Sequence, residues 1–168
     1  MRLTQGHDAP PRRGGFTLLE LMVVVGVVAI LALMALPTYQ DKIVRDQIAE
    51  ALPLADLAKA PVAAAWAATQ SFPADNAAAA LPPADKIVNN FVRSVAVENG
   101  AIHVTFGNRA NGQIKDKVLT LRPAVVEDAP VVPVTWVCGA APAPDKMTVK
   151  GENRTSIPAA FLPFRCRA

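Results

Sequence analysis

The sequence is poor in the residues from which catalytic and metal sites are usually built. Its 168 residues include two histidines and two cysteines, and the sequence contains neither a metal-ligand cluster nor a glycine-rich phosphate loop. His103 lies on a predicted strand, where we expect a structural histidine with its hydrogen bonds satisfied rather than a base or a ligand. Asp145 and Glu152 lack the spacing of a calcium-binding loop. We therefore expect no enzymatic activity, no metal and no cofactor.

Charge is also scarce, and its small positive excess does not indicate nucleic-acid binding. The formal net charge is +3, but Arg2, Arg12 and Arg13 lie in the first fifteen residues, offset only by Asp8. The remaining chain is nearly neutral. Basic residues near the C-terminus could attract DNA phosphates by charge, but few aromatic residues lie among them. A solvated basic face is the simpler interpretation for this set, which comprises Lys146, Lys150, Arg154, Arg165 and Arg167.

The longest apolar segment, Leu21 to Gln40, contains no charged residue. A helix rises about 1.5 Å per residue, so a segment of this length can cross a hydrocarbon core of about 30 Å. The arginines that precede it favour a cytoplasmic N-terminus.

Three simple interpretations of this segment compete. A cleaved secretory signal is disfavoured because Leu33 and Ala35 form a poor cleavage site and Glu20 interrupts the apolar core. A twin-arginine signal at 12–13 is disfavoured because the following residues fit badly and the apolar run is too long. A plain membrane anchor fits, but it leaves Glu20 unexplained. A carboxylate costs about 2.5–3.5 kcal/mol at the bilayer centre.

The segment GGFTLLELMVVVGVVAILALMALPTYQDK closely resembles the N-terminus of type IV prepilins, and more specifically of type IVa pilins. In that family a basic leader ends in a glycine, here Gly15, and a prepilin peptidase cuts after it. The new N-terminal residue, here Phe16, is N-methylated, and the fifth mature residue is a glutamate, here Glu20. The resemblance implies a leader at 1–15, a transmembrane and filament-core helix at 16–40, and a pilin head at 41–168.

The resemblance also supplies a reason for Glu20. Cleavage creates a positive amine on Phe16, and in this family the glutamate of one subunit faces the terminal amine of a neighbour. Two charges that are each costly in an apolar medium become tolerable when they are paired, whereas a broken pair leaves a buried charge. We therefore expect Glu20 and Phe16 to direct subunit assembly.

After Tyr39 the sequence becomes amphipathic. Apolar residues recur at helical spacing, which predicts one helix from about Phe16 to Ala68, with Pro53 and Pro61 bending or locally opening it. The predicted buried face contains Val44, Ile48, Leu52, Ala55, Val62 and Trp66.

The rest of the chain predicts strands. Residues 69–90 form a connecting loop with room for one helical turn. Residues 91–107 alternate around Asn99-Gly100, a strong hairpin signal, and 116–126 and 130–138 supply two further strands. The expected fold class is α+β, with a long N-terminal helix packed on a four-stranded antiparallel sheet, as in the pilin fold.

The segment from Trp136-Val137-Cys138 to Cys166-Arg167 resembles the disulfide-bounded loop of type IVa pilins. The resemblance implies a Cys138–Cys166 bridge, which would stabilise the head by about 3–4 kcal/mol. It also suggests contact of the loop with surfaces or neighbouring subunits.

The resemblance implies a structural subunit that polymerises into a type IVa pilus. Its implied partners are copies of itself, prepilin peptidase, an inner-membrane platform, assembly and retraction ATPases and an outer-membrane secretin. The precursor would lie in the inner membrane and the mature protein in an extracellular fimbrium. Adhesion, twitching motility and biofilm formation follow, with DNA uptake less supported. The alternatives are a minor pilin, a type II secretion pseudopilin, or a membrane-tethered DNA-binding receptor.

Overall fold

The computed structural model describes residues 14–168, so the expected leader lies outside the described residues except for Gly14 and Gly15. The chain divides into two compact units, one ending at Thr38 and the other covering Tyr39–Ala168. We call the second unit the head. The first helix, α1, covers Leu18–Thr69 and contributes to both units.

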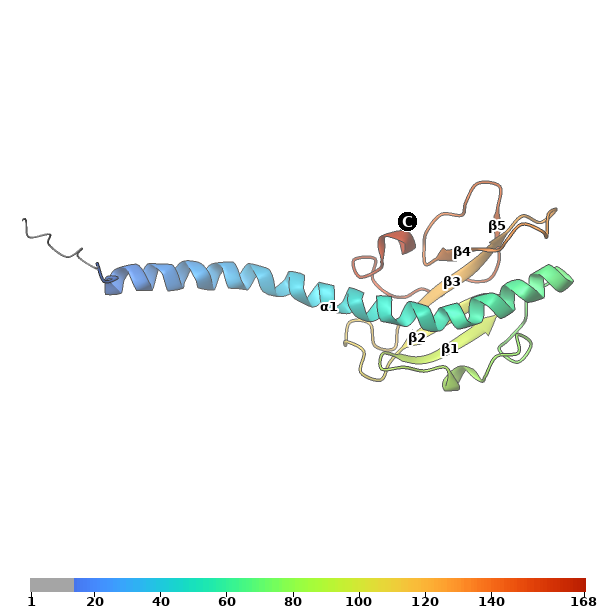
Figure 1. Ribbon diagram of the computed structural model, residues 1–168, viewed down its shortest axis with the longest axis horizontal. Coiled ribbons are helices and arrows are strands. Elements are labelled where there is room, and N and C mark those ends of the chain that lie inside the picture. Colours follow the sequence, from blue (N-terminus) through green and yellow to red (C-terminus); the bar gives the residue numbers. More distant parts are fainter. Residues whose placement is uncertain (1–13) are drawn as a thin grey trace, which may run out of the picture. The chain divides into compact units, whose positions relative to one another are not determined.

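Helix α1 confirms the predicted long helix to within two residues at each end (Figure 1). The expected local opening at Pro53 and Pro61 is not seen, because the helix continues through both positions. Each proline removes one backbone hydrogen bond, to the carbonyls of Ala49 and Leu57 respectively. The buried face on either side of these positions holds the helix against the sheet, so these single losses do not break it.

The head portion of α1 buries one stripe of apolar side chains. The buried residues follow steps of three and four, as a helix packed on a sheet requires. Leu52, which was expected on this face, is half-buried, and the small Ala51 takes the fully buried position beside it. The stripe consists of Val44, Ile48, Ala51, Ala55, Ala58, Val62 and Trp66.

The predicted four-stranded antiparallel sheet is confirmed. Its strands are β1 (Val92–Glu98), β2 (Ala101–Phe106), β3 (Val118–Val125) and β4 (Thr135–Cys138), in the order β1-β2-β3-β4. The predicted hairpin turn has positive φ at both central residues, 49° at Asn99 and 83° at Gly100. Asparagine and glycine tolerate this conformation best, which explains why the turn forms here.

A short strand, β5 (Thr148–Val149), was not predicted. It pairs with the end of β3, where Ala124 is paired with Val149 on one side and with Thr135 of β4 on the other. Strand β5 therefore extends the sheet on the β2 side of β3. Between α1 and β1, the 3-10 turn η1 (Ala84–Lys86) supplies the helical turn expected in the 69–90 loop, and a second turn, η2 (Phe164–Cys166), lies near the C-terminus.

The two faces of the sheet are covered by different parts of the chain. Ile102, Val104 and Phe106 belong to the core that also contains the buried stripe of α1. Side chains alternate along a strand, so His103 points to the opposite face. That face is crossed by residues 150–156, here called the strap, whose Arg154 backbone N–H donates to Thr120 Oγ1 at 3.1 Å.

Candidate functional site

The predicted cleavage point lies in a short non-helical segment just before α1. Residues 14–17 carry no helix or strand, and Phe16 is 83% exposed. Apart from the adjacent residues, no atom of residues 14–168 lies within 4 Å of the position a side chain would take at Gly14 or Gly15. The Gly15–Phe16 peptide bond is therefore extended away from packing partners among the described residues. This arrangement suits a peptidase, which needs unpaired backbone at the bond that it cuts.

Thr17 begins the helix, and Glu20 lies in its first turn. The Thr17 Oγ1 atom accepts a hydrogen bond from the Glu20 backbone N–H at 3.2 Å, so Thr17 is the N-cap and Glu20 occupies the third helical position. The Thr-x-x-Glu order is that of a capping box, so the sequence itself carries a signal for the start of this helix. The carboxylate of Glu20 also lies near the positive end of the helix dipole.

Glu20 is the acidic residue of an otherwise apolar surface. Its side chain is exposed, and within residues 14–168 it makes no ion pair or side-chain hydrogen bond. The residues that follow it are apolar on every side of the helix and are also exposed; they include Leu21, Val24, Val27, Ile30 and Leu31. In length and composition α1 is suited to cross a membrane. A helix that is apolar all round requires lipid or other helices around it.

The cysteine pair implied by the resemblance is confirmed. Cys138 and Cys166 form a disulfide with a Cα–Cα distance of 4.5 Å, and both are buried. The bridge joins the end of β4 to η2 and closes the loop that contains β5 and the strap. Gly139, with φ of 59°, approaches the backbone so closely that a side chain there would lie 2.6 Å from the Cys166 carbonyl oxygen. Only glycine fits this junction.

The strap is held by a charged fork. The guanidinium of Arg154 donates to both carboxylate oxygens of Glu98, at 2.5 and 2.6 Å, and to Glu152 at 3.1 Å. These hydrogen bonds raise the pKa of Arg154, which stays positively charged. The fork joins the strap to the end of β1 and thereby fixes it across the sheet.

His103 lies beneath the strap as a buried residue, and the expectation that it is structural needs one correction. Its Nδ1 atom is 3.0 Å from Thr120 Oγ1, but its Nε2 atom has no partner among the described residues. Burial lowers the pKa of His103, and the positive Arg154 lowers it further, while Glu98 and Glu152 act in the opposite direction. A neutral imidazole is therefore favoured at this position.

The basic residues near the C-terminus are largely committed to internal contacts. Arg154 is paired as described, Lys150 pairs with Glu127, and Arg167 donates to the carbonyls of Leu162 and Ala160. Within the described residues no group of three potential ligands that could hold a metal ion occurs, and Asp145 and Glu152 are not brought together with a third ligand.

Comparisons with known proteins agree with this geometry. Residues 44–167 match the profile of the bacterial filament protein pilin, and residues 10–36 match the prokaryotic N-terminal methylation motif. The chain is 37% identical to the type IV major pilin protein PilE1 of Neisseria gonorrhoeae, over 91% of this chain and 86% of that protein. It is 34% identical to a fimbrial protein of Neisseria meningitidis serogroup B, over 91% and 93%. It is 33% identical to fimbrial protein EcpC of Eikenella corrodens, over 91% and 90%.

A long N-terminal helix packed on an antiparallel sheet, closed by a C-terminal disulfide, defines the pilin class of filament subunits. This chain belongs to the type IV pilin family and carries its N-terminal methylation motif. It is therefore a structural filament subunit and not an enzyme. The family implies a polymeric pilus and processing by prepilin peptidase.

Proposed function

We propose that this chain is the major subunit of a type IVa pilus. Prepilin peptidase cuts after Gly15, Phe16 is N-methylated, and the mature chain polymerises through its apolar helix. Three observations support this proposal: the exposed Gly15–Phe16 bond, the match over 10–36, and similarity along nearly the whole chain to proteins named as major pilins. The abundance expected of a major subunit separates this function from that of a minor pilin or a pseudopilin.

The observation that carries the assembly mechanism is Glu20, which is exposed and unpaired among residues 14–168 on a helix whose neighbouring surface is apolar. A carboxylate in this position is costly in lipid or in a dry filament core. Cleavage supplies the missing counter-charge, the Phe16 amine. An amine on a neighbouring subunit removes the cost only when that subunit lies at the correct height, so the pair selects the register of assembly.

The cellular setting follows from these steps. The precursor resides in the inner membrane through residues 16–40, and the platform, the assembly ATPase and the secretin move the polymer to the cell exterior. A retraction ATPase would support twitching motility, and the exposed heads would support adhesion and biofilm formation. DNA uptake has weaker support because the basic residues of the head are mostly paired with acidic groups or carbonyls.

Replacement of Glu20 tests the pairing. In the Glu20→Ala chain we expect normal cleavage after Gly15 but at least a tenfold loss of filaments, because the Phe16 amine would be left without its partner. Mass spectrometry of the membrane fraction reports cleavage, and electron microscopy of sheared material reports filaments. Asp128→Ala, which removes an exposed acidic side chain from the head, is the matched control. Normal filaments from the Glu20 variant would rule out the pairing.

A second variant separates processing from assembly. Gly15→Val adds a branched side chain at the cleavage site, so the leader should remain attached and the chain should stay in the membrane. If this variant is cut normally, the site lies elsewhere and Phe16 does not supply the amine.

A further inference from the structure

The head exposes large apolar side chains that its own fold does not cover. Phe164 in η2 is 90% exposed, and Leu57 and Val88 are 58% and 47% exposed. Large exposed apolar groups on a subunit that polymerises are candidates for burial between copies. These three residues fall at two separate places on the head.

Leu57 and Val88 belong to an apolar groove of about 380 Å³ between α1 and the loop that follows it. Its lining, here called the groove, consists of Lys86 and six apolar residues: Leu54, Leu57, Leu81, Pro82, Ile87 and Val88. The wall opposite α1 is formed by the loop residues 81–88, and the buried Asn76 holds this loop in place. The Asn76 amide donates to the Pro82 and Val95 carbonyls and accepts from the Val97 N–H. These bonds tie the loop to the free edge of β1, so the groove is a preformed feature.

Phe164 is a fixed projection rather than a loose side chain. It begins η2, two residues before Cys166, which is buried and held by the disulfide. The Arg167 guanidinium lies 5.4 Å from the centre of its ring. Side-chain and backbone freedom are therefore already reduced, which lowers the entropy cost of placing the ring in a partner.

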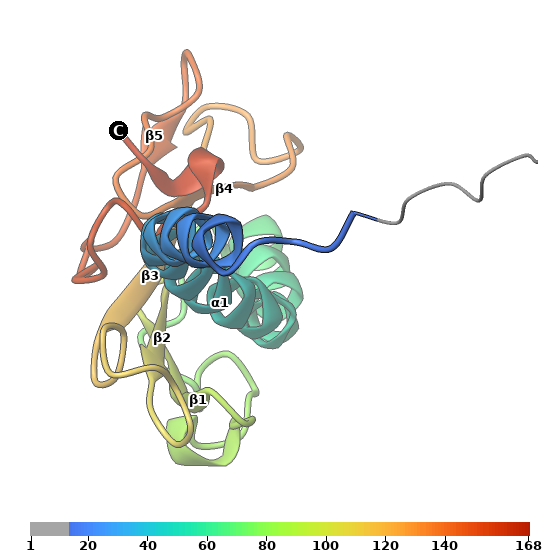
Figure 2. The same cartoon turned by 90° about the vertical axis from the view of Figure 1, so that its left-hand side faces the viewer.

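The two features lie at opposite edges of the sheet. The groove lies beside β1 and η1, and Phe164 lies beside β4, while the strand order separates β1 from β4 by two strands. Figure 2 shows β1 and the C-terminal turn on opposite sides of α1. An interface between two different edges of the same molecule repeats from copy to copy and builds an open helical array. A contact of this kind suits a filament subunit.

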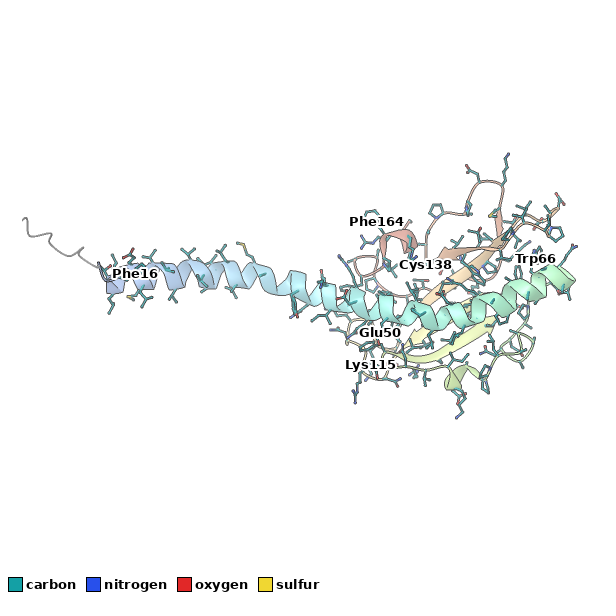
Figure 3. The ribbon with its side chains drawn as sticks, viewed as in Figure 1. Phe16, Glu50, Trp66, Lys115, Cys138 and Phe164 are labelled. Carbon is teal, nitrogen blue, oxygen red and sulfur yellow. A yellow bond between two sulfur atoms is a disulfide. The ribbon has the colours of Figure 1, made fainter. Side chains whose placement is uncertain are left out.

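Each edge carries one charge of the opposite sign that is unpaired among the described residues, while Lys86 in the groove lining lies 3.9 Å from its own partner, Asp85. Glu50 lies one helical turn before Leu54 on the groove side of α1, and Arg165 follows Phe164 directly. Figure 3 shows Glu50 and Phe164 on opposite sides of α1. Both charged side chains are exposed, and neither forms an ion pair within residues 14–168. Opposite charges beside a projection and beside a groove favour one relative orientation of two copies.

We propose that Phe164 of each subunit inserts into the groove of a neighbouring subunit in the filament, with Arg165 directed toward Glu50 of that neighbour. The inference rests on the proposed function, because it needs the chain to polymerise. It assigns the disulfide a second role besides stability: the bridge holds the aromatic projection in place for the neighbouring head.

Site-specific photocrosslinking in assembled filaments tests this contact. Phe164 is replaced by p-benzoylphenylalanine in the full-length chain, filaments are sheared and irradiated, and crosslinked peptides are identified by mass spectrometry. We expect dimers joined to residues 54–57 or 81–88 of another copy. Val131, which is 89% exposed at a different place on the head, is the matched control position, and its probe should give no crosslink to the groove.

The remaining outcomes are also decisive. Filaments whose Phe164 probe crosslinks elsewhere, or to nothing, overturn the contact but leave assembly through Glu20 intact. If the bulky probe at Phe164 blocks assembly, the reverse probe at Leu57 must crosslink to residues 163–166, and its failure to do so overturns the contact. Wild-type cells that make no filament overturn the proposed function itself.

A charge exchange tests the proposed pairing of Arg165 with Glu50. The double variant Glu50→Arg with Arg165→Glu should restore at least half of the filaments that either single variant loses.

Discussion

The two portions of helix α1 differ in how their apolar side chains are distributed around the helix and in what covers them. From Leu21 to Ala35 the side chains are apolar in every direction and exposed, whereas from Val44 to Trp66 a single apolar stripe is buried and the other faces carry charge. The head portion has its partner, the sheet, within the same chain. A helix surface that is apolar all round requires lipid or other helices around it, and we propose that lipid and then other subunits supply this cover for the N-terminal portion. The two portions therefore differ in whether the apolar side chains are covered by the head or, as we propose, by assembly.

A single lysine placed in each portion gives the sharpest test of that difference. Val27→Lys puts a charge on the N-terminal portion, where every face is apolar, and costs about 2.5–3.5 kcal/mol near a bilayer centre. We expect filament yield to fall about 100-fold. Ala49→Lys, on an exposed face of the head portion, should leave yield within twofold. Quantitative immunoblots of sheared filaments measure both, and equal losses would mean that the two portions do not differ in this way.

A cavity-forming pair tests the same contrast through stability. Ile48 is fully buried in the head, and Ile48→Ala should lower the free energy of unfolding by about 2–5 kcal/mol. Ile30 is exposed in the N-terminal portion, so Ile30→Ala should change head unfolding by less than about 0.5 kcal/mol. Thermal unfolding of the detergent-solubilised full chain distinguishes them. Similar destabilisation by both changes would show that the N-terminal portion is packed on the head.

His103, which is buried beneath the strap, should make the unfolding free energy of the head dependent on pH. Because burial and Arg154 lower the pKa of His103 below 6.5, the unfolded chain binds a proton at a higher pH than the folded one. This contribution is complete above pH 6.5 and is lost as the pH falls through that value toward the folded pKa, by at most about 1.4 kcal/mol per pH unit. Glu98 and Glu152 oppose the shift and limit its size.

His103→Gln isolates this contribution. The wild-type head should lose unfolding free energy between pH 7 and pH 5, and the variant should show a shallower decline, measured by thermal unfolding at several pH values. Equal slopes for the two chains would show that His103 is not protonated differently in the folded and unfolded states.

Local signals predicted the main elements of the fold correctly. The apolar period of α1 and the Asn99-Gly100 turn are encoded by neighbouring residues, so the helix and the β1-β2 hairpin were foreseeable. Strand β5 has only two residues and no pattern to detect. The ion pair between Arg154 and Glu98 joins residues far apart in sequence, and no local sequence pattern near either residue predicts it. His103 lies beneath the strap that this contact joins to β1, and the same lack of local signal explains why its unpaired Nε2 atom was not anticipated.

The processing and assembly roles of Gly15, Phe16 and Glu20 stay predictions, drawn from a pattern that is short and contiguous. The helix start at Thr17 could have been predicted from the Thr-x-x-Glu order. The expected opening at Pro53 and Pro61 was wrong because propensity describes an isolated helix, whereas packing on the sheet decides the outcome in the head; a bend at these positions stays a prediction. The groove and Phe164 come from opposite edges of the folded head, and only the three-dimensional structure relates them.

Cryo-electron microscopy of sheared filaments, at a resolution that shows side chains, tests assembly by charge pairing most directly. We expect the mature chain to begin at Phe16 and its amine to lie about 3 Å from the Glu20 carboxylate of an adjacent subunit, the distance of a charged hydrogen bond. A chain that begins elsewhere, or a Glu20 carboxylate with no neighbouring amine within reach, would contradict the pairing.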